Sequence, residues 1–393
     1  MLVSSAPGRL WRFARSLATA MVTALSLAVA AHAQVLPRLP ALGLQSDSVT
    51  VSGLSSGGYM AGQFQVAYSA SLAGAAVLAG GPYGCAHGSV SAAMLTCSCP
   101  AEQPFLLKAS QALGAGCQAF NPAVYLVFSE AAAKGNRADI DDLGHLKDHR
   151  IWLFSGGQDR VVNRQLVDAA QRFYEGQGVP AERIQLRFRS DAGHGFPSLQ
   201  ATASCDTTKT PFLTRCDDLD AAGELLQWLY PDMVGLSAGQ ADEQGSLKQF
   251  KQAPYGRQRE FNGLDTTGWV YVPKACEQGG GTPCKLHVVF HGCEQGQAFG
   301  SGRKRFGLQF VTGTGYNRWA EAGHIVVLYP QVRPSQRGDF FHPFQFNPKG
   351  CWDFWGYTEK FAALNPGAPD YAKRSAPQMR AVKAMIDDLL KRP

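Results

Sequence analysis

A serine flanked at two positions by glycine is the residue whose surroundings most clearly suggest chemistry. Residues 53–57 read Gly-Leu-Ser-Ser-Gly, with a strand pattern over residues 47–53 and apolar residues at helical spacing afterwards. A serine on such a strand-to-helix turn projects its hydroxyl toward a base, and the glycines leave room for the strained backbone. We therefore interpret Ser55 as the nucleophile of an ester hydrolase. Ser56 fits less well, because Leu54 rather than glycine stands two residues before it.

Two further residues could complete a proton-transfer chain with this serine. In α/β-hydrolases an acid and then a histidine follow the nucleophile along the chain, each on a loop after a strand. Asp159 follows a predicted strand at residues 151–154, and His194 stands between glycines after a predicted strand at residues 184–188. We expect His194 to accept the serine proton and Asp159 to hold the imidazole in the required tautomer.

Other residues of the same types remain as alternatives. Asp191 and Asp148 also lie close to predicted strands and could replace Asp159 as the acid. The chain has nine histidines, and most histidines in proteins are surface residues or hydrogen-bonded core residues. We interpret four of them in this way: His87, His145, His149 and His324.

An ester hydrolase also needs N–H donors for the oxyanion of its transition state. The backbone of Ser56 supplies one, and the second candidate is the His-Gly-Cys turn at residues 291–293, after a predicted strand at residues 286–290. In α/β-hydrolases this turn precedes the nucleophile, whereas here it follows. A circular permutation accounts for the rotated order, with the polar stretch at residues 231–262 as the new link between the old ends.

The elements that position these residues alternate between strands and helices, which predicts an α/β fold with a mainly parallel sheet. Residues 376–390 have the apolar spacing of an amphipathic closing helix. We expect one α/β-hydrolase domain over residues 34–393, in which residues 231–262 form a connector rather than a domain boundary. Three more strands are predicted, at residues 75–79, 269–272 and 325–329.

The first 33 residues do not fit into that domain. Three arginines precede an apolar run at residues 17–30, and Ala31-His32-Ala33 offers the small residues that a signal peptidase recognises. The run is shorter than the roughly 20 residues of a membrane anchor, so we expect a cleaved signal peptide at residues 1–33, export to the periplasm or the cell exterior, and no membrane attachment afterwards.

The charge of the chain argues against nucleic-acid binding. Cleavage of the signal peptide lowers the formal charge from +6 to +3, and the remaining basic residues are scattered along the sequence.

All ten cysteines follow the predicted cleavage site, and an even number in an exported chain indicates up to five disulfides. A zinc site is the alternative, but Cys97 and Cys99 are too closely spaced for the usual zinc ligand pairs. We expect neither a metal nor a cofactor. The cysteines are Cys85, Cys97, Cys99, Cys117, Cys205, Cys216, Cys276, Cys284, Cys293 and Cys351.

Taken together, the motifs resemble the catalytic domain of secreted, circularly permuted poly(3-hydroxybutyrate) depolymerases. The resemblance rests on residues 53–61, 157–159, 193–195, 290–293 and 350–353. It implies a triad of Ser55, Asp159 and His194, an oxyanion hole from the Ser56 and Cys293 N–H groups, and Trp352 in the cleft that holds the polyester. We also predict a disulfide between Cys293 and Cys351, which would tie the second oxyanion donor to Trp352.

The resemblance implies a monomeric enzyme that hydrolyses ester bonds of poly(3-hydroxybutyrate) or its oligomers through an acyl-serine intermediate. A feruloyl or acetyl esterase acting on carbohydrate-linked esters is the alternative enzyme. A polymer-surface binding protein that kept the fold and lost the chemistry is the alternative of another class. The complete set of catalytic residue types argues against the binding protein.

The preferred physical form of the polymer can also be predicted. Many members of that family carry a linker and a separate polymer-binding domain, and we recognise neither in this sequence. We therefore expect much faster degradation of amorphous granules or soluble oligomers than of crystalline film, because no adsorbing domain raises the local concentration on a solid. Specific rates from granule turbidity and film mass loss test this expectation, and equal rates would contradict it.

Overall fold

An eight-stranded sheet lies at the centre of the structure, which is a computed structural model. The structure describes residues 1, 36–98, 121–237, 243–258, 260–277, 283–336, 345–359 and 370–393. The predicted signal peptide at residues 1–33 lies outside these ranges, apart from Met1. Residues 37–393 form one compact unit. No helix within the described ranges has both the length and the apolar character that crossing a membrane requires.

The sheet is mainly parallel, as predicted. Its strand β9 (Thr267–Val272) runs antiparallel to both of its neighbours, and every other neighbouring pair is parallel. The α/β fold class is therefore confirmed. In spatial order the strands are β4 (Ile184–Arg189), β3 (Arg150–Gly156), β2 (Gly74–Leu78), β1 (Thr50–Leu54), β10 (Lys285–Phe290), β11 (Ile325–Tyr329), β9 and β8 (Ser246–Lys251).

The strand order agrees with a circular permutation. Suppose that the C-terminus is joined to the N-terminal end of the domain and that the strands of the large sheet are counted from β8. Then β10 is the third strand and β1 is the fifth. The oxyanion turn of an α/β-hydrolase follows the third strand, which is the position of residues 291–293 here. The ends to be joined are adjacent, because Leu42 N–H donates to the Leu389 carbonyl (3.2 Å) and Gly43 N–H to the Lys391 carbonyl (2.7 Å).

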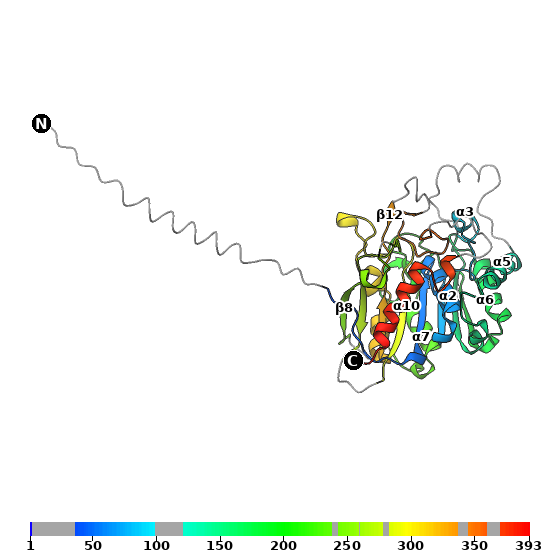
Figure 1. The fold of residues 1–393 in the computed structure, drawn as a ribbon, viewed down its shortest axis with the longest axis horizontal. Coiled ribbons are helices and arrows are strands. Elements are labelled where there is room, and N and C mark those ends of the chain that lie inside the picture. Colours follow the sequence, from blue (N-terminus) through cyan, green and yellow to red (C-terminus); the bar gives the residue numbers. More distant parts are fainter. Residues whose placement is uncertain are drawn as a thin grey trace. The chain divides into compact units, whose positions relative to one another are not determined.

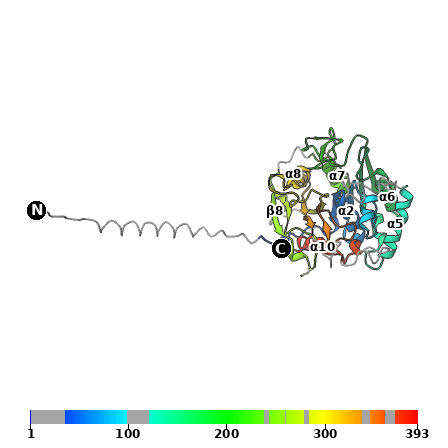
Figure 2. The same ribbon diagram turned by 90° about the horizontal axis from the view of Figure 1, so that it is seen from above.

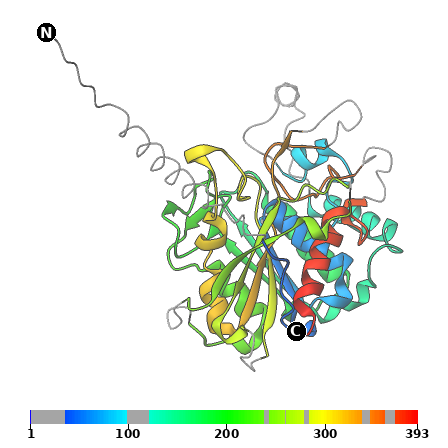
Figure 3. The same ribbon diagram turned by 60° about the vertical axis from the view of Figure 1, so that its left-hand side comes forward.

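One part of the predicted connector is corrected by the structure. Residues 246–251, within the stretch 231–262, form the edge strand β8, which pairs with β9 (yellow-green in Figure 3). The strand has few apolar residues because an edge strand needs to bury little, and only Phe250 of β8 is fully buried. A smaller difference concerns β1, which begins at Thr50 because residues Ser46–Ser48 form a 3-10 turn.

Helices cover both faces of the sheet. Gly74 faces Leu229 of α7 (Ala221–Leu229), whereas Val77, three positions along β2, faces Gly62 of α2 (Ser56–Ala67). Since successive strand residues point to opposite faces, α2 and α7 lie on opposite sides (Figure 2). The closing helix α10 (Pro377–Leu390) lies beside α2 (Figure 1). The other α-helices within the described residues are α3 (Val90–Leu95), α5 (Pro122–Gly135), α6 (Arg164–Gly176), α8 (Gln309–Gly313) and α9 (Tyr316–Gly323).

A buried polar network lies beneath the strand that ends at the nucleophile turn. His287 of β10 makes hydrogen bonds of 2.7 Å to Thr50 Oγ1 through Nδ1 and to Ser52 Oγ through Nε2. Thr50 donates its own proton to Tyr230, so Nδ1 of His287 is a donor. Burial lowers the pKa of His287 to about 3, so the imidazole is neutral and its Nε2 is an acceptor.

Stability should fall in mild acid because three histidines are buried in the neutral form. Burial lowers the pKa of His149 and His291 to about 4 and that of His287 to about 3, against about 6.5 in the unfolded chain. Below pH 6.5 the unfolded state binds more protons, so the free energy of unfolding decreases as pH falls toward the folded-state values. Between pH 6.5 and 5 each histidine should cost about 2 kcal/mol.

Denaturant titrations at pH 7.5, 6.5 and 5 measure this loss. In a His149→Gln variant one of the three groups is gone, and the decrease between pH 6.5 and 5 should be about one third smaller. A free energy of unfolding that stays constant over this range would contradict the prediction.

Candidate active site

The turn after β1 holds Ser55 in a backbone conformation that side chains rarely adopt. Its φ and ψ are 58° and −122°, at the residue that precedes the first turn of α2. Two glycines make the turn possible. A Cβ on Gly53 would lie 2.2 Å from the Gly57 carbonyl oxygen, and a Cβ on Gly57 would lie 2.2 Å from the Phe290 carbonyl oxygen. The glycine spacing in the sequence therefore has a steric cause in the packing of β1, α2 and β10.

The structure distinguishes between the two adjacent serines. Ser55 is partly exposed, and its backbone N–H is held by the Leu78 carbonyl at 2.9 Å. Ser56 is buried, and its hydroxyl oxygen accepts a hydrogen bond from the Trp352 N–H at 3.3 Å. Only Ser55 presents a hydroxyl that an incoming ester could reach.

Asp159 and His194 are brought together by the structure. Asp159 Oδ2 and His194 Nδ1 are 2.8 Å apart, and both side chains are almost completely buried. The other carboxylate oxygen accepts the N–H groups of Val161 (2.8 Å) and Val162 (2.9 Å), which fixes the orientation of the carboxylate. Because Nδ1–H is donated to Asp159, His194 keeps Nε2 as a proton acceptor.

The alternative acids lie elsewhere. Asp191 forms an ion pair with Arg189 at the surface, and this pairing lowers the pKa of Asp191. Asp148 is exposed, at the end of a 3-10 helix.

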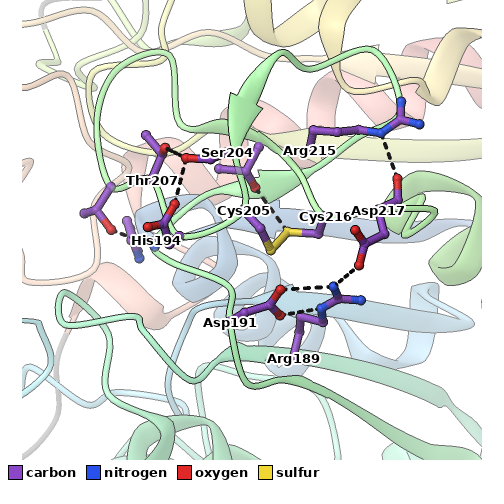
Figure 4. The surroundings of a disulfide bond; sticks show 12 residues. Arg189, Asp191, His194, Ser204, Cys205, Thr207, Arg215, Cys216 and Asp217 are labelled. Atoms are coloured by element: carbon purple, nitrogen blue, oxygen red, sulfur yellow. Dashed lines mark hydrogen bonds and ion pairs between the residues drawn. A yellow bond between two sulfur atoms is a disulfide. The ribbon is translucent and has the colours of Figure 1, made fainter.

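A disulfide-bonded loop holds the backbone on either side of His194 (Figure 4). Gly193 N–H donates to the Cys205 carbonyl at 2.8 Å, and His194 N–H donates to Thr208 Oγ1 at 2.9 Å. Cys205 is bonded to Cys216, which closes the loop. The loop backbone comes so close that a Cβ on Gly193 would lie 2.3 Å from the Asp206 carbonyl oxygen. Glycine is therefore required next to this histidine for a steric reason.

Ser55, Asp159 and His194 follow the carboxyl ends of β1, β3 and β4, and because these strands are parallel, the three ends lie at the same edge of the sheet. Within the described residues, however, no hydrogen bond joins Ser55 Oγ to His194. In unliganded sites the contact between nucleophile and base is often long and shortens when substrate binds. The structure thus brings the acid and base into contact and places the serine at the same edge.

The turn after β10 leaves one backbone N–H without a partner. Gly292 N–H donates to Gln295 Oε1 (2.8 Å) and Glu294 N–H donates to the Lys349 carbonyl (2.7 Å), but no described group accepts the N–H of Cys293 between them. A Cβ placed on Gly292 would lie 3.5 Å from the Ser55 Cβ, so the turn is next to Ser55. An unpartnered N–H at this position can bind an oxyanion.

Buried His291 orients that peptide. Its Nε2 accepts the Val332 N–H at 3.1 Å, so Nδ1 carries the proton and donates to the Gly292 carbonyl at 2.7 Å. The Gly292 carbonyl and the Cys293 N–H belong to one trans peptide and point in opposite directions. The imidazole therefore fixes the direction of the Cys293 N–H.

The structure joins Cys293 and Cys351 by a disulfide. Three others occur within the described residues: Cys85–Cys97, Cys205–Cys216 and Cys276–Cys284. Cys99 and Cys117 lie outside the described residues. Among the described residues, no three His, Cys, Asp or Glu side chains are grouped as metal ligands.

The expected position of Trp352 in an open cleft is corrected. Its side chain is completely buried, and its ring packs against Phe290 (centroids 4.9 Å apart) and His291 (5.7 Å). A side chain without exposed surface offers no contact to a substrate in this conformation. Trp352 instead packs against Phe290 at the end of β10 and against His291, and its backbone N–H bonds to Ser56 at the start of α2.

Sequence reasoning missed an aspartate that holds the segment after Cys351. The buried carboxylate of Asp353 accepts the N–H groups of residues 355–358 and the hydroxyl of Thr358. Burial raises the pKa of Asp353, and these hydrogen bonds oppose that rise. The Asp353 carbonyl accepts Gln63 Nε2 of α2 at 2.7 Å. The only signal in the sequence was its place directly after Cys351-Trp352, which does not specify these partners.

Comparisons with known proteins agree on one family. No protein-family profile matches the chain. The chain is 37% identical over 389 residues to a poly(3-hydroxybutyrate) depolymerase of Delftia acidovorans, covering 96% of this chain and 66% of that protein. It is 32% identical over 329 residues to a polyhydroxybutyrate depolymerase of Talaromyces funiculosus, covering 81% of this chain and 85% of that protein.

Solved structures of the same family are also similar. A PHB depolymerase from Penicillium funiculosum superposes with a TM-score of 0.68, and a PHB depolymerase complexed with an R3HB trimer superposes with a TM-score of 0.67. Each is 29% identical in sequence, and each comparison covers 90% of this chain and 98% of the other.

Proposed function

The chain belongs to the poly(3-hydroxybutyrate) depolymerase family, and from this premise we propose that it hydrolyses the ester bonds of poly(3-hydroxybutyrate) or its oligomers. The reaction would pass through an acyl-Ser55 intermediate. The observation that carries the proposal is the buried Asp159–His194 pair, which lies at the same sheet edge as the strained serine. A hydrogen-bonded acid and base beside an exposed hydroxyl are the groups that ester hydrolysis by a serine requires.

The proposed first step is proton transfer from Ser55 Oγ to Nε2 of His194 as Oγ attacks the ester carbonyl. Asp159, hydrogen-bonded to His194 Nδ1, stabilises the imidazolium. The tetrahedral intermediate collapses when His194 returns the proton to the leaving hydroxyl group, which releases the first product and leaves the acyl group on Ser55. Water then attacks the acyl-serine with His194 as base, which frees the acid product and restores the serine.

Two backbone donors would stabilise the tetrahedral oxyanion. Ser56 N–H is at the first turn of α2, where the helix dipole favours negative charge. Cys293 N–H comes from the turn after β10, and its direction is fixed by His291. Both donors belong to rigid backbone, so no reorganisation is needed when charge develops.

Two assays test the proposal. A fluorophosphonate probe should label Ser55, identified by peptide mapping, and an unlabelled serine would support the non-catalytic binding protein instead. Turbidity loss of polyhydroxybutyrate granules, run beside release of ferulate from a feruloyl ester, separates the polyester hydrolase from the carbohydrate-linked esterase. Ferulate release without granule clearing would refute the polyester substrate.

We further propose that the protein is exported after cleavage of residues 1–33 and acts as a monomer, detached from the membrane and without metal or cofactor. The four disulfides among the described residues support an oxidising compartment. Assays of the periplasmic fraction and the culture medium, with size-exclusion chromatography of the active fraction, test the location and the oligomeric state.

A further inference from the structure

One buried glutamine connects the two halves of the candidate active site. The side chain of Gln295 is 1% exposed. Its Oε1 accepts the Gly292 N–H at 2.8 Å, and its Nε2 donates to the carbonyls of Pro211 (2.9 Å) and Phe212 (3.3 Å). One amide group thus spans the oxyanion turn and the loop that follows His194.

On the oxyanion side, the glutamine completes the restraint of the Gly292 backbone. His291 holds the Gly292 carbonyl, and Gln295 holds the Gly292 N–H. Both peptide planes of this glycine are therefore fixed, including the plane that carries the Cys293 N–H. A glycine without these partners could rotate, because its backbone has the widest choice of conformations.

On the base side, the glutamine holds the backbone that packs against His194. The Phe212 carbonyl also accepts the Phe196 N–H at 2.8 Å, and Phe196 is two residues after the histidine. The Phe212 ring contacts the imidazole edge-on, with centroids 6.1 Å apart. A shift of Phe212 would therefore shift His194.

We infer that Gln295 is a positioning residue that sets the distance between the Cys293 N–H and His194. The inference rests on the proposed function, in which both groups act on one tetrahedral intermediate. An error of about 1 Å in such an arrangement can cost roughly 100-fold in rate. Only an amide of this length meets the requirement: methionine has no donors, glutamate has no N–H, and asparagine is one methylene shorter.

Gln297 provides a matched control two residues further along. It is also largely buried, but its side chain bonds to Trp269 Nε1 (2.7 Å) and to the Thr267 carbonyl (2.8 Å), both in β9. The same change to methionine at both positions removes a buried amide of equal size. Only the change at Gln295 cuts the connection between the oxyanion turn and the base loop.

The experiment compares kcat and KM of the wild type, Gln295→Met and Gln297→Met on p-nitrophenyl butyrate, after thermal unfolding has verified that each variant is folded at the assay temperature. We expect Gln295→Met to lower kcat about 100-fold with KM changed less than about 3-fold, and Gln297→Met to keep kcat within about 3-fold. Gln295→Glu retains the acceptor for the Gly292 N–H but loses the donor to the Pro211 and Phe212 carbonyls, so it should also lower kcat. This variant is used instead of Gln295→Met if the methionine variant does not fold.

Equal kcat values for the Gln295 variants and Gln297→Met would overturn the inference, as would a loss seen only in KM. The proposed substrate is tested separately with a soluble 3-hydroxybutyrate trimer. A wild type that cleaves p-nitrophenyl butyrate but not the trimer would refute the polyester substrate, and the comparison at Gln295 would still decide the positioning role.

Discussion

Ser55→Ala and His194→Ala are each expected to lower turnover by roughly 10⁵- to 10⁶-fold, and the double variant should be no slower than either single one. The nucleophile and the base act as one unit, so removing either removes the whole proton-transfer step. Ser55→Ala should leave the fold intact, because Ser55 is partly exposed and makes no hydrogen bond through its hydroxyl among the described residues. Single-turnover kinetics with p-nitrophenyl butyrate would measure the loss.

His145→Ala is the matched control for the histidine change. His145 is exposed on a 3-10 helix, so this variant should keep wild-type turnover. If His194→Ala were as active as His145→Ala, with the same unfolding temperature, the assignment of the base would be wrong.

Removing the bond between Cys293 and Cys351 is expected to lower kcat about 100-fold to 1,000-fold, with a smaller change in KM. Cys293 carries the proposed second oxyanion donor, and Cys351 precedes the tryptophan whose N–H bonds to Ser56. An oxyanion donor must be in position before charge develops, because it stabilises the transition state more than the bound substrate. The change tested is Cys293→Ser together with Cys351→Ser, which leaves no unpaired thiol.

The paired change Cys276→Ser with Cys284→Ser controls for the loss of a cross-link. In the chain-entropy model the 58-residue separation of Cys293 and Cys351 gives about 4 kcal/mol and the 8-residue separation of Cys276 and Cys284 about 2.5 kcal/mol. Both variants should therefore unfold more easily, but only the first should lose turnover at a temperature where both are folded. If the two double variants had equal kcat values, the Cys293–Cys351 bond would have no catalytic role. Non-reducing peptide mapping of the wild type checks the pairing itself.

The sequence alone predicted the parts of this protein that depend on local patterns. The strands that were expected at residues 75–79, 151–154, 184–188, 269–272, 286–290 and 325–329 correspond to strands of the sheet. Four of them, β2, β3, β10 and β11, are parallel strands buried on both faces, and such strands have apolar segments that are visible without tertiary information. The rotated order of the motifs indicated the circular permutation before the strand order was known.

The candidate residues Ser55, Asp159 and His194 could be proposed from the sequence for a similar reason. Each follows a predicted strand, and the turns at Ser55 and His194 need glycines for which the structure gives a steric cause. The edge strand β8 was missed because its burial is slight and its composition is polar.

Only the tertiary structure decided which side chains hold those residues in place. Gln295 contacts Pro211 and Phe212, 84 and 83 residues away in the chain, and no periodicity or motif encodes a hydrogen bond over that separation. The same holds for Trp352: its type suggested a substrate contact, but its ring packs against Phe290 and His291 and is completely buried. Local sequence determines where the backbone turns and which groups could react, whereas long-range packing determines where those groups point.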